Sequence, residues 1–201
     1  MKKSTKIQWY LLVLALMVAV SACGKTVSRR SHTEAIDLSG RWNDTDSQLV
    51  SQEMIKDALA WPWIEQWNQA QGKKPIVMAY GVKNRTSEHI NTQTFMKDLE
   101  RALLRSGRVT VVADKDQRDD VRGERAEQQL GLTSNPSAIG KELGANFVVT
   151  GVINSIEDRE GGEKVVFYQT NLEMINVETN EKVWIGDKKI KKFIDQSGLK
   201  L

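Results

Sequence analysis

Residues 75–82, Pro-Ile-Val-Met-Ala-Tyr-Gly-Val, decide the fold. Almost every position is apolar, which is typical of a central β-strand that is covered on both faces. A helical stripe follows this strand at the spacing i, i+4, i+7, i+8, formed by Phe95, Leu99, Ala102 and Leu103. Val109-Thr110-Val111-Val112 then predicts a second strand. Strand, helix and strand in this order predict an α/β layer.

Upstream of this layer, the sequence predicts two helices that meet at Pro62. Apolar residues at helical spacing predict the first helix from Ser47 to Ala60, with Thr45 or Asp46 as its cap. Pro62 ends or bends that helix, and a second helix carries Trp63 and Trp67. These tryptophans have two interpretations. They clamp the helices onto the sheet, or they lie exposed and anchor a partner protein.

Downstream, residues 114–130 are dominated by charge and predict a solvated helix that Gly131 ends. A short helix is predicted next, capped by Ser134 or Asn135 and ended by Gly144. Three strands complete the chain as a meander, at 147–156, 166–174 and 182–193. The predicted fold is therefore α+β, with α/β layering and a mixed, largely antiparallel sheet of about four to five strands flanked by helices.

The amino terminus resembles a bacterial lipoprotein signal. Three lysines precede an uncharged run from Trp9 to Val20, and Val20-Ser21-Ala22 directly precedes Cys23. The apolar run is shorter than the roughly 20 residues of a membrane-spanning helix. Residues 1–22 are therefore predicted to be a cleaved signal peptide, with Cys23 as the lipidation site. An ordinary secretory leader followed by a chance cysteine is the alternative.

The composition restricts the classes of partner. Removal of residues 1–22 takes away three lysines, so the formal charge of +3 falls to about zero. The one basic cluster, Lys188 to Lys192, is small, and no nucleic-acid partner is expected. Lipidation uses the only cysteine, which leaves none for a disulfide. The expected organisation is a short flexible tether at 23–40, which carries the lipid, and a single globular domain at 41–201.

No catalytic or metal-binding motif is present in the sequence. The two histidines are His32, in the predicted tether, and His89, which has no His or Cys partner at ligand spacing. Glycine-rich phosphate-binding motifs are absent as well. We therefore expect no enzyme, no cofactor and no metal site, although a carboxylate pair assembled by folding would be compatible with a hydrolase.

Several short patterns together resemble one family. They are Asn84-Arg85-Thr86 after the first strand, the helix ending at Gly107, Gln128-Gln129-Leu130-Gly131-Leu132, Leu143-Gly144-Ala145-Asn146-Phe147-Val148-Val149, and Val177-Glu178-Thr179-Asn180-Glu181-Lys182-Val183-Trp184. In this order they are similar to the LpoB-like outer-membrane lipoproteins that activate penicillin-binding proteins, whose fold resembles the amino-terminal domain of TolB. The similarity extends over about residues 75–193.

This resemblance implies a regulator that performs no chemistry. It implies a lipid-anchored protein of the outer membrane, with its domain in the periplasm, that binds a bifunctional class A penicillin-binding protein and raises peptidoglycan synthesis. The candidate partner-binding residues are Asn84, Arg85, Thr86, Trp63 and Trp67, although a strand-ending turn also explains residues 84–86. The alternative is another envelope binding or assembly lipoprotein, such as a relative of the curli pore lipoprotein, with no role at the synthase.

Overall fold

The computed structural model describes residues 27–195 of the chain. The predicted signal peptide and Cys23 lie outside the described residues. The chain separates into two compact units between Glu34 and Ala35. In the described part of the first unit, the Glu34 N–H donates to the Ser31 carbonyl in a turn. The sheet and the helices belong to the second unit.

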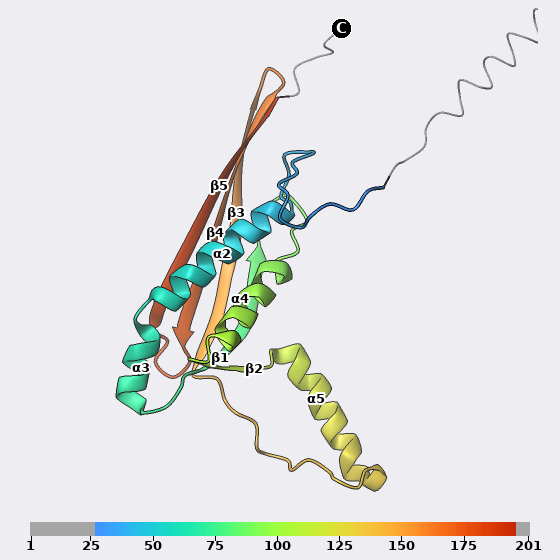
Figure 1. The fold of residues 1–201 in the computed structure, drawn as a ribbon, viewed down its shortest axis with the longest axis vertical. Coiled ribbons are helices and arrows are strands. Elements are labelled where there is room, and N and C mark those ends of the chain that lie inside the picture. The colour runs from blue at the N-terminus through green and yellow to red at the C-terminus, as the bar shows by residue number, and fades with distance from the viewer. Residues whose placement is uncertain (1–26, 196–201) are drawn as a thin grey trace, which may run out of the picture. The chain divides into compact units, whose positions relative to one another are not determined.

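A five-stranded mixed sheet forms the centre of the second unit (Figure 1). Its strands are β1 (Ile76–Asn84), β2 (Thr110–Val112), β3 (Phe147–Glu160), β4 (Glu163–Asn176) and β5 (Lys182–Asp195), in the spatial order β2-β1-β3-β4-β5. β1 runs parallel to β2 and β3, whereas β3, β4 and β5 form an antiparallel meander. The predicted α+β class and the mixed sheet are confirmed.

Three helices pack against one face of this sheet: α2 (Asp44–Ala60), α3 (Trp63–Gln71) and α4 (Gln93–Arg105). The core that they share with the sheet includes Val50 and Met54 of α2, Leu99 of α4, and Phe147 and Val149 of β3. Apolar residues at helical spacing in α2 and α4 bury one stripe of each helix, which is what holds both helices on the sheet. None of the helices in residues 27–195 is long and apolar enough to span a membrane.

The first turn of α2 differs from its prediction. The N-cap is Asn43, not Thr45 or Asp46. The Asn43 side chain accepts a hydrogen bond from the Asp46 N–H, and the Asp46 carboxylate accepts one from the Asn43 N–H. This reciprocal capping box satisfies two backbone donors at once, so the helix begins before the first apolar residue that marks it in the sequence.

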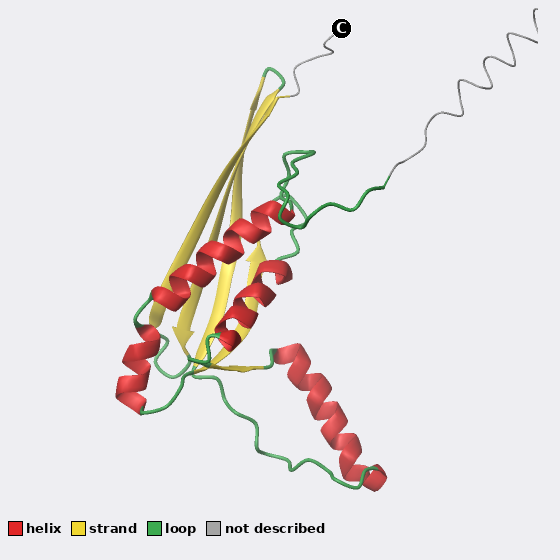
Figure 2. Ribbon diagram, viewed as in Figure 1, coloured by secondary structure: helices red, strands yellow, loops and turns green. Residues whose placement is uncertain are grey.

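The opposite face of the sheet has no helix of the described residues over it, and we call it the uncovered face (Figure 2). Because side chains alternate along a strand, this face receives every second residue, and of those in β1 Met78 is buried at 6% exposure. Four large side chains are exposed on it: Tyr80, Ile156, Ile185 and Phe193. The prediction that the first strand is covered on both faces is therefore wrong for Tyr80.

The predicted charged helix is confirmed as α5 (Lys115–Glu127), which continues into a π-helical turn, η1 (Gln128–Leu132). The short helix predicted up to Gly144 is absent from this described stretch. Instead, Ser137 is tied to η1, because its N–H donates to the Gln128 side chain and its carbonyl accepts from Gln129. We call residues 115–144 the arm. No residue of the arm is buried, so nothing supplies the packing that a short helix needs.

Candidate partner-binding site

The turn after β1 contains three of the predicted partner-binding residues. The side-chain Oδ1 of Asn84 accepts hydrogen bonds from the Thr86 N–H at 3.0 Å and the Thr86 hydroxyl at 2.8 Å. The Asn84 amide donates to the Glu88 carbonyl at 2.7 Å, and the Glu88 N–H donates to the Thr86 hydroxyl. Asn84 and Thr86 thus use their polar groups to fix the turn, as short polar side chains commonly do.

Arg85 occupies the position in this turn that is open to a partner. Its backbone N–H donates to the Ile153 carbonyl, which fixes the main chain. Its side chain is exposed and makes no hydrogen bond or ion pair within residues 27–195. Lys83 and His89, on either side of the turn, are exposed as well. The turn therefore presents an unpaired guanidinium from a rigid backbone, an arrangement suited to a carboxylate.

Glu88 joins this turn to two other elements, a role that sequence reasoning missed. Its carboxylate accepts a hydrogen bond from the Tyr168 hydroxyl of β4 at 2.7 Å and one from the backbone N–H of Trp42 at 2.9 Å. The rings of Trp42 and Tyr168 meet edge to face, with centroids 5.3 Å apart. Burial, followed by the hydrogen bond to Glu88, raises the pKa of the Tyr168 hydroxyl, which therefore stays protonated as a donor.

A second set of contacts joins the turn to β3 through Ser87. The Ser87 hydroxyl donates to Glu157 of β3 at 2.7 Å, and Glu157 also pairs with Arg159 and Lys164. The hydrogen bond from Ser87, followed by those from Arg159 and Lys164, lowers the pKa of Glu157 to about 2. The turn is therefore anchored to both β3 and β4.

Residues 36–43, which we call the strap, are tied to β5. The Lys192 ammonium group lies 2.8 Å from the Asp37 carboxylate, 2.6 Å from Asp46, and donates to the Arg41 carbonyl at 2.9 Å. Lys192 is 9% exposed and Asp46 is 3% exposed. Burial alone lowers the pKa of Lys192, but the hydrogen bonds and charges of Asp37 and Asp46 outweigh it and raise the pKa. These charged contacts fix the part of the predicted tether that lies next to the domain.

The strap also approaches β5 closely at one glycine. Gly40 has a φ of 66°, and a Cβ atom placed there would lie 2.3 Å from the Ile194 Cγ1 atom. Only glycine combines that backbone conformation with so short a separation without strain. Packing and charge thus hold the strap at neighbouring positions on the same strand.

The two candidate tryptophans lie on the helix side of the sheet. Trp63 is 2% exposed, and its indole N–H donates to the Ala58 carbonyl at 2.9 Å. Trp67 is partly buried, and both rings meet Phe147 edge to face, at centroid distances of 5.4 and 5.0 Å. Of the two interpretations, this geometry favours packing for Trp63, because its ring has no accessible face. Trp61, which precedes them, is 45% exposed.

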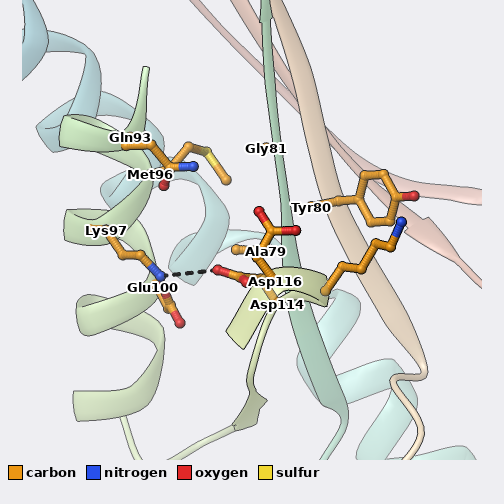
Figure 3. Close-up of a pocket in the computed structure, with 10 residues that line it drawn as sticks. Ala79, Tyr80, Gly81, Gln93, Met96, Lys97, Glu100, Asp114 and Asp116 are labelled. Carbon is orange, nitrogen blue, oxygen red and sulfur yellow. Dashed lines mark hydrogen bonds and ion pairs between the residues drawn. The ribbon is translucent and has the colours of Figure 1, made fainter. Parts of the chain in front are cut away.

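A cleft of about 160 Å³ lies beside the part of β1 that extends past β2 (Figure 3). Lys97 lines it and pairs with Glu100 at 2.7 Å and with Asp114 at 3.5 Å. The hydrogen bond to Glu100 is the main cause that raises the pKa of Lys97. A lysine held in its charged form is unsuited to act as a base or as a nucleophile. Within residues 27–195, no group of three or more acidic, His or Cys residues could hold a metal ion.

Comparison with known proteins places this chain beside one family. The family model described as "Peptidoglycan-synthase activator LpoB" matches residues 46–190. A search of curated protein sequences gave no match. The chain is also similar to a number of solved structures, of which three are described below; each has a low TM-score, so the family match carries the assignment.

The C-terminal domain of LpoB from Salmonella enterica is 22% identical, with a TM-score of 0.35 over 64% of this chain and 93% of that chain. The C-terminal domain of LpoB from Escherichia coli is 22% identical, with a TM-score of 0.36 over 73% and 98%. Lipoprotein GNA1162 from Neisseria meningitidis is 12% identical, with a TM-score of 0.37 over 59% and 83%.

Proposed function

Because the chain belongs to the family of the peptidoglycan-synthase activator LpoB, we propose that it binds a bifunctional class A penicillin-binding protein and raises its activity. The observation that carries this proposal is the family match over residues 46–190, which includes the sheet from β1 to β4 and the turn after β1. In this role the protein regulates peptidoglycan synthesis, and through it cell shape, without performing chemistry itself.

The mechanism is a shift in the conformational equilibrium of the synthase. An activator that binds the active conformation more tightly than the inactive one raises the population of the active conformation. Couplings of this kind are typically about 1–3 kcal/mol, which corresponds to roughly 5-fold to 150-fold in an equilibrium constant. The activator needs only a surface that recognises one state of the synthase.

We propose the turn after β1 as a contact surface, with Arg85 as the residue that touches the partner. Asn84 and Thr86 hold the turn through their hydrogen bonds, so little conformational freedom is lost when Arg85 binds. Arginine is enriched among the residues that dominate interface energies. A carboxylate on the synthase surface is the complementary group.

The lipid on Cys23 attaches the domain to the outer membrane, with the domain in the periplasm. Fourteen peptide bonds separate Cys23 from Asp37, where the strap begins its contacts with Lys192. Fully extended, this length reaches at most about 50 Å. The start of the strap therefore lies within that distance of the anchor, and the synthase must present its regulatory region to the domain there.

The test is a binding and polymerisation assay with the chain from Gly24 to Leu201, which contains all of the second unit. We expect saturable binding to one bifunctional synthase of the source organism and faster glycan polymerisation. Arg85→Ala should weaken binding about 5-fold to 30-fold, equivalent to roughly 1–2 kcal/mol. Arg105→Ala, which removes an exposed arginine of α4, is the matched control and should bind as the parent does. No binding and no rate change with any such synthase would contradict the proposed function.

A further inference from the structure

The connection from β2 to β3 stands away from the sheet (Figure 1), and not over the face where parallel-sheet geometry places such a connection. β2, β1 and β3 are parallel neighbours in that order. The β1–α4–β2 unit has its helix on the covered face, and the chain then crosses back over β1 to reach β3. Parallel crossovers are right-handed with very few exceptions. A right-handed return crossover lies on the opposite face of the sheet, which is the uncovered face.

The arm forms that return connection, and it has little to hold it in its present position. α5 contains no buried residue, and isolated helices of its length are marginal in water. Its ion pairs lie within the arm, where Arg122 and Arg125 both bind Glu142. Five large apolar side chains of the arm are exposed: Val121, Leu130, Leu132, Ile139 and Leu143.

The arm is long enough to cross the uncovered face. One row of paired residues runs across the sheet from Gly81 through Thr150 and Glu173 to Ile185. From β1 to β5 this row spans three strand separations, or roughly 15 Å. The thirteen residues of α5 span about 20 Å. Exposed apolar side chains stand near both ends of the row, at Tyr80 and Ile185.

We propose that the arm is a lid that closes over the uncovered face of its own chain. Closure buries apolar side chains of the arm against those of the face, the main favourable term in packing. The arm is covalently joined to the sheet at both ends, so its effective concentration at the face is far above that of a second molecule. The arm turns about two short hinges, at Ala113 and at Gly144-Ala145, because Asn146 is fixed by backbone hydrogen bonds to Ile76 and Val177.

Disulfide trapping tests the lid directly. The chain from Gly24 to Leu201 contains no cysteine, so the only thiols in each variant are those introduced by substitution. Ile185→Cys is combined in turn with Val121→Cys, Leu130→Cys, Leu132→Cys and Ile139→Cys, and each pair is oxidised at low protein concentration. We expect at least one pair to form an intramolecular disulfide, since a bond requires Cα atoms within about 7 Å. In the control pairs, Leu104→Cys, at an exposed position on α4, takes the place of Ile185→Cys. These pairs should form no intramolecular disulfide.

A labelling experiment tests the same closure without a trap. Ile185→Cys is reacted with a maleimide in the intact chain and in a chain whose arm is replaced by a Gly-Ser linker. A lid that is closed nine-tenths of the time slows labelling about tenfold. Removal of the arm should therefore make labelling of Ile185→Cys about tenfold faster. Leu104→Cys should react equally fast in both chains. Equal rates at Ile185→Cys, or disulfides that form only between molecules, would overturn the lid. Neither experiment involves a synthase, so the proposed function is tested separately.

Discussion

The strap and the arm are two segments without helix or sheet partners of their own layer, and they are held in opposite ways. The strap, residues 36–43, is held by Lys192, which is 9% exposed and binds the Asp37 carboxylate and the Arg41 carbonyl. Lys192 is itself paired with Asp46 of α2, which is 3% exposed. The arm, residues 115–144, has ion pairs of its own, but no residue in it is buried. The difference shows that contacts to buried groups hold a segment on the domain, whereas ion pairs between exposed side chains of one segment do not.

The physical reason is the solvent around the charges. An exposed ion pair gains little, because water and salt screen it and two long side chains lose freedom. A buried pair gains more from its attraction but has first lost its hydration, so removal of one partner leaves an uncompensated charge. The strap therefore depends on the complete group of Lys192, Asp37 and Asp46, whereas the arm can lose an ion pair at little cost.

The largest expected effect comes from Lys192→Met. It leaves the buried Asp46 carboxylate without its partner, a change that typically costs about 3–5 kcal/mol. Denaturant unfolding of the chain from Gly24 to Leu201 measures it. Lys191→Met is the control, because the neighbouring lysine is exposed and its loss should change stability by less than about 0.5 kcal/mol. Equal midpoints for the two variants would contradict the difference between strap and arm.

Gly40→Ala and Gly131→Ala make the same substitution in the strap and in the arm, so that their effects on stability can be compared. Both glycines have positive φ, at 66° and 80°, but a Cβ atom at Gly40 meets Ile194, whereas the space around Gly131 is open. We expect Gly40→Ala to lower the free energy of unfolding by about 2 kcal/mol. Gly131→Ala strains only the arm and should leave the global midpoint unchanged. A larger global loss from Gly131→Ala would reverse the comparison.

Glu88→Gln tests how the strap is joined to the turn after β1. Glutamine keeps one acceptor but loses the charge that receives the Tyr168 hydroxyl and the Trp42 N–H. A loss of about 1–2 kcal/mol in unfolding free energy is expected, with faster amide exchange at Trp42. Glu178→Gln, in the exposed turn after β4, serves as the control. Unchanged exchange at Trp42 would show that Glu88 does not hold the strap.

The smallest effect is a local pH dependence in the arm. Hydrogen bonds from Arg122 and then Arg125 lower the pKa of Glu142 to about 2 from an ordinary 4.5. A lowered folded-state pKa means that the stabilisation is complete above about pH 4.5 and is lost as the pH falls toward 2. The protection of the Arg125 amide in α5, measured as its exchange rate relative to that of an unstructured peptide at the same pH, should therefore fall over that window, while the protection of Val149 in β3 does not. Glu142→Gln should remove the pH dependence, and a dependence that persists would exclude Glu142 as its source.

Much of the fold could be predicted from the sequence, because periodicity reports local burial. The stripe from Phe95 to Leu103 predicted α4, and the alternation from Val166 to Met174 predicted β4. The helix predicted before Gly144 failed for the same physical reason. A cap at Ser134 or Asn135 can start a helix, but the residues after it bury no side chain, and short helices need that packing.

The site was less predictable, because it depends on pairs that are distant in sequence. Lys192 belongs to a run of lysines that was interpreted as one small basic cluster. Strand alternation separates that run, so Lys192 points inward to Asp46 while Lys191 points to solvent. Glu88 gave no signal either, because its partners, Trp42 and Tyr168, lie 46 and 80 residues away. Burial of Trp63 was one of two interpretations of the sequence, and only the structure, in which it is 2% exposed, distinguishes them.

The strap also determines how the domain responds to a mechanical load. A pull on the chain from the amino-terminal side of the strap reaches Asp37 first, where Lys192 resists it, and Trp42 only afterwards, where Glu88 resists it. The contact with Lys192 and the contact with Glu88 are therefore loaded one after the other, and not at the same time. A steady pull would peel the strap from β5 while the sheet stays folded, which lengthens the chain that leads to the domain under tension.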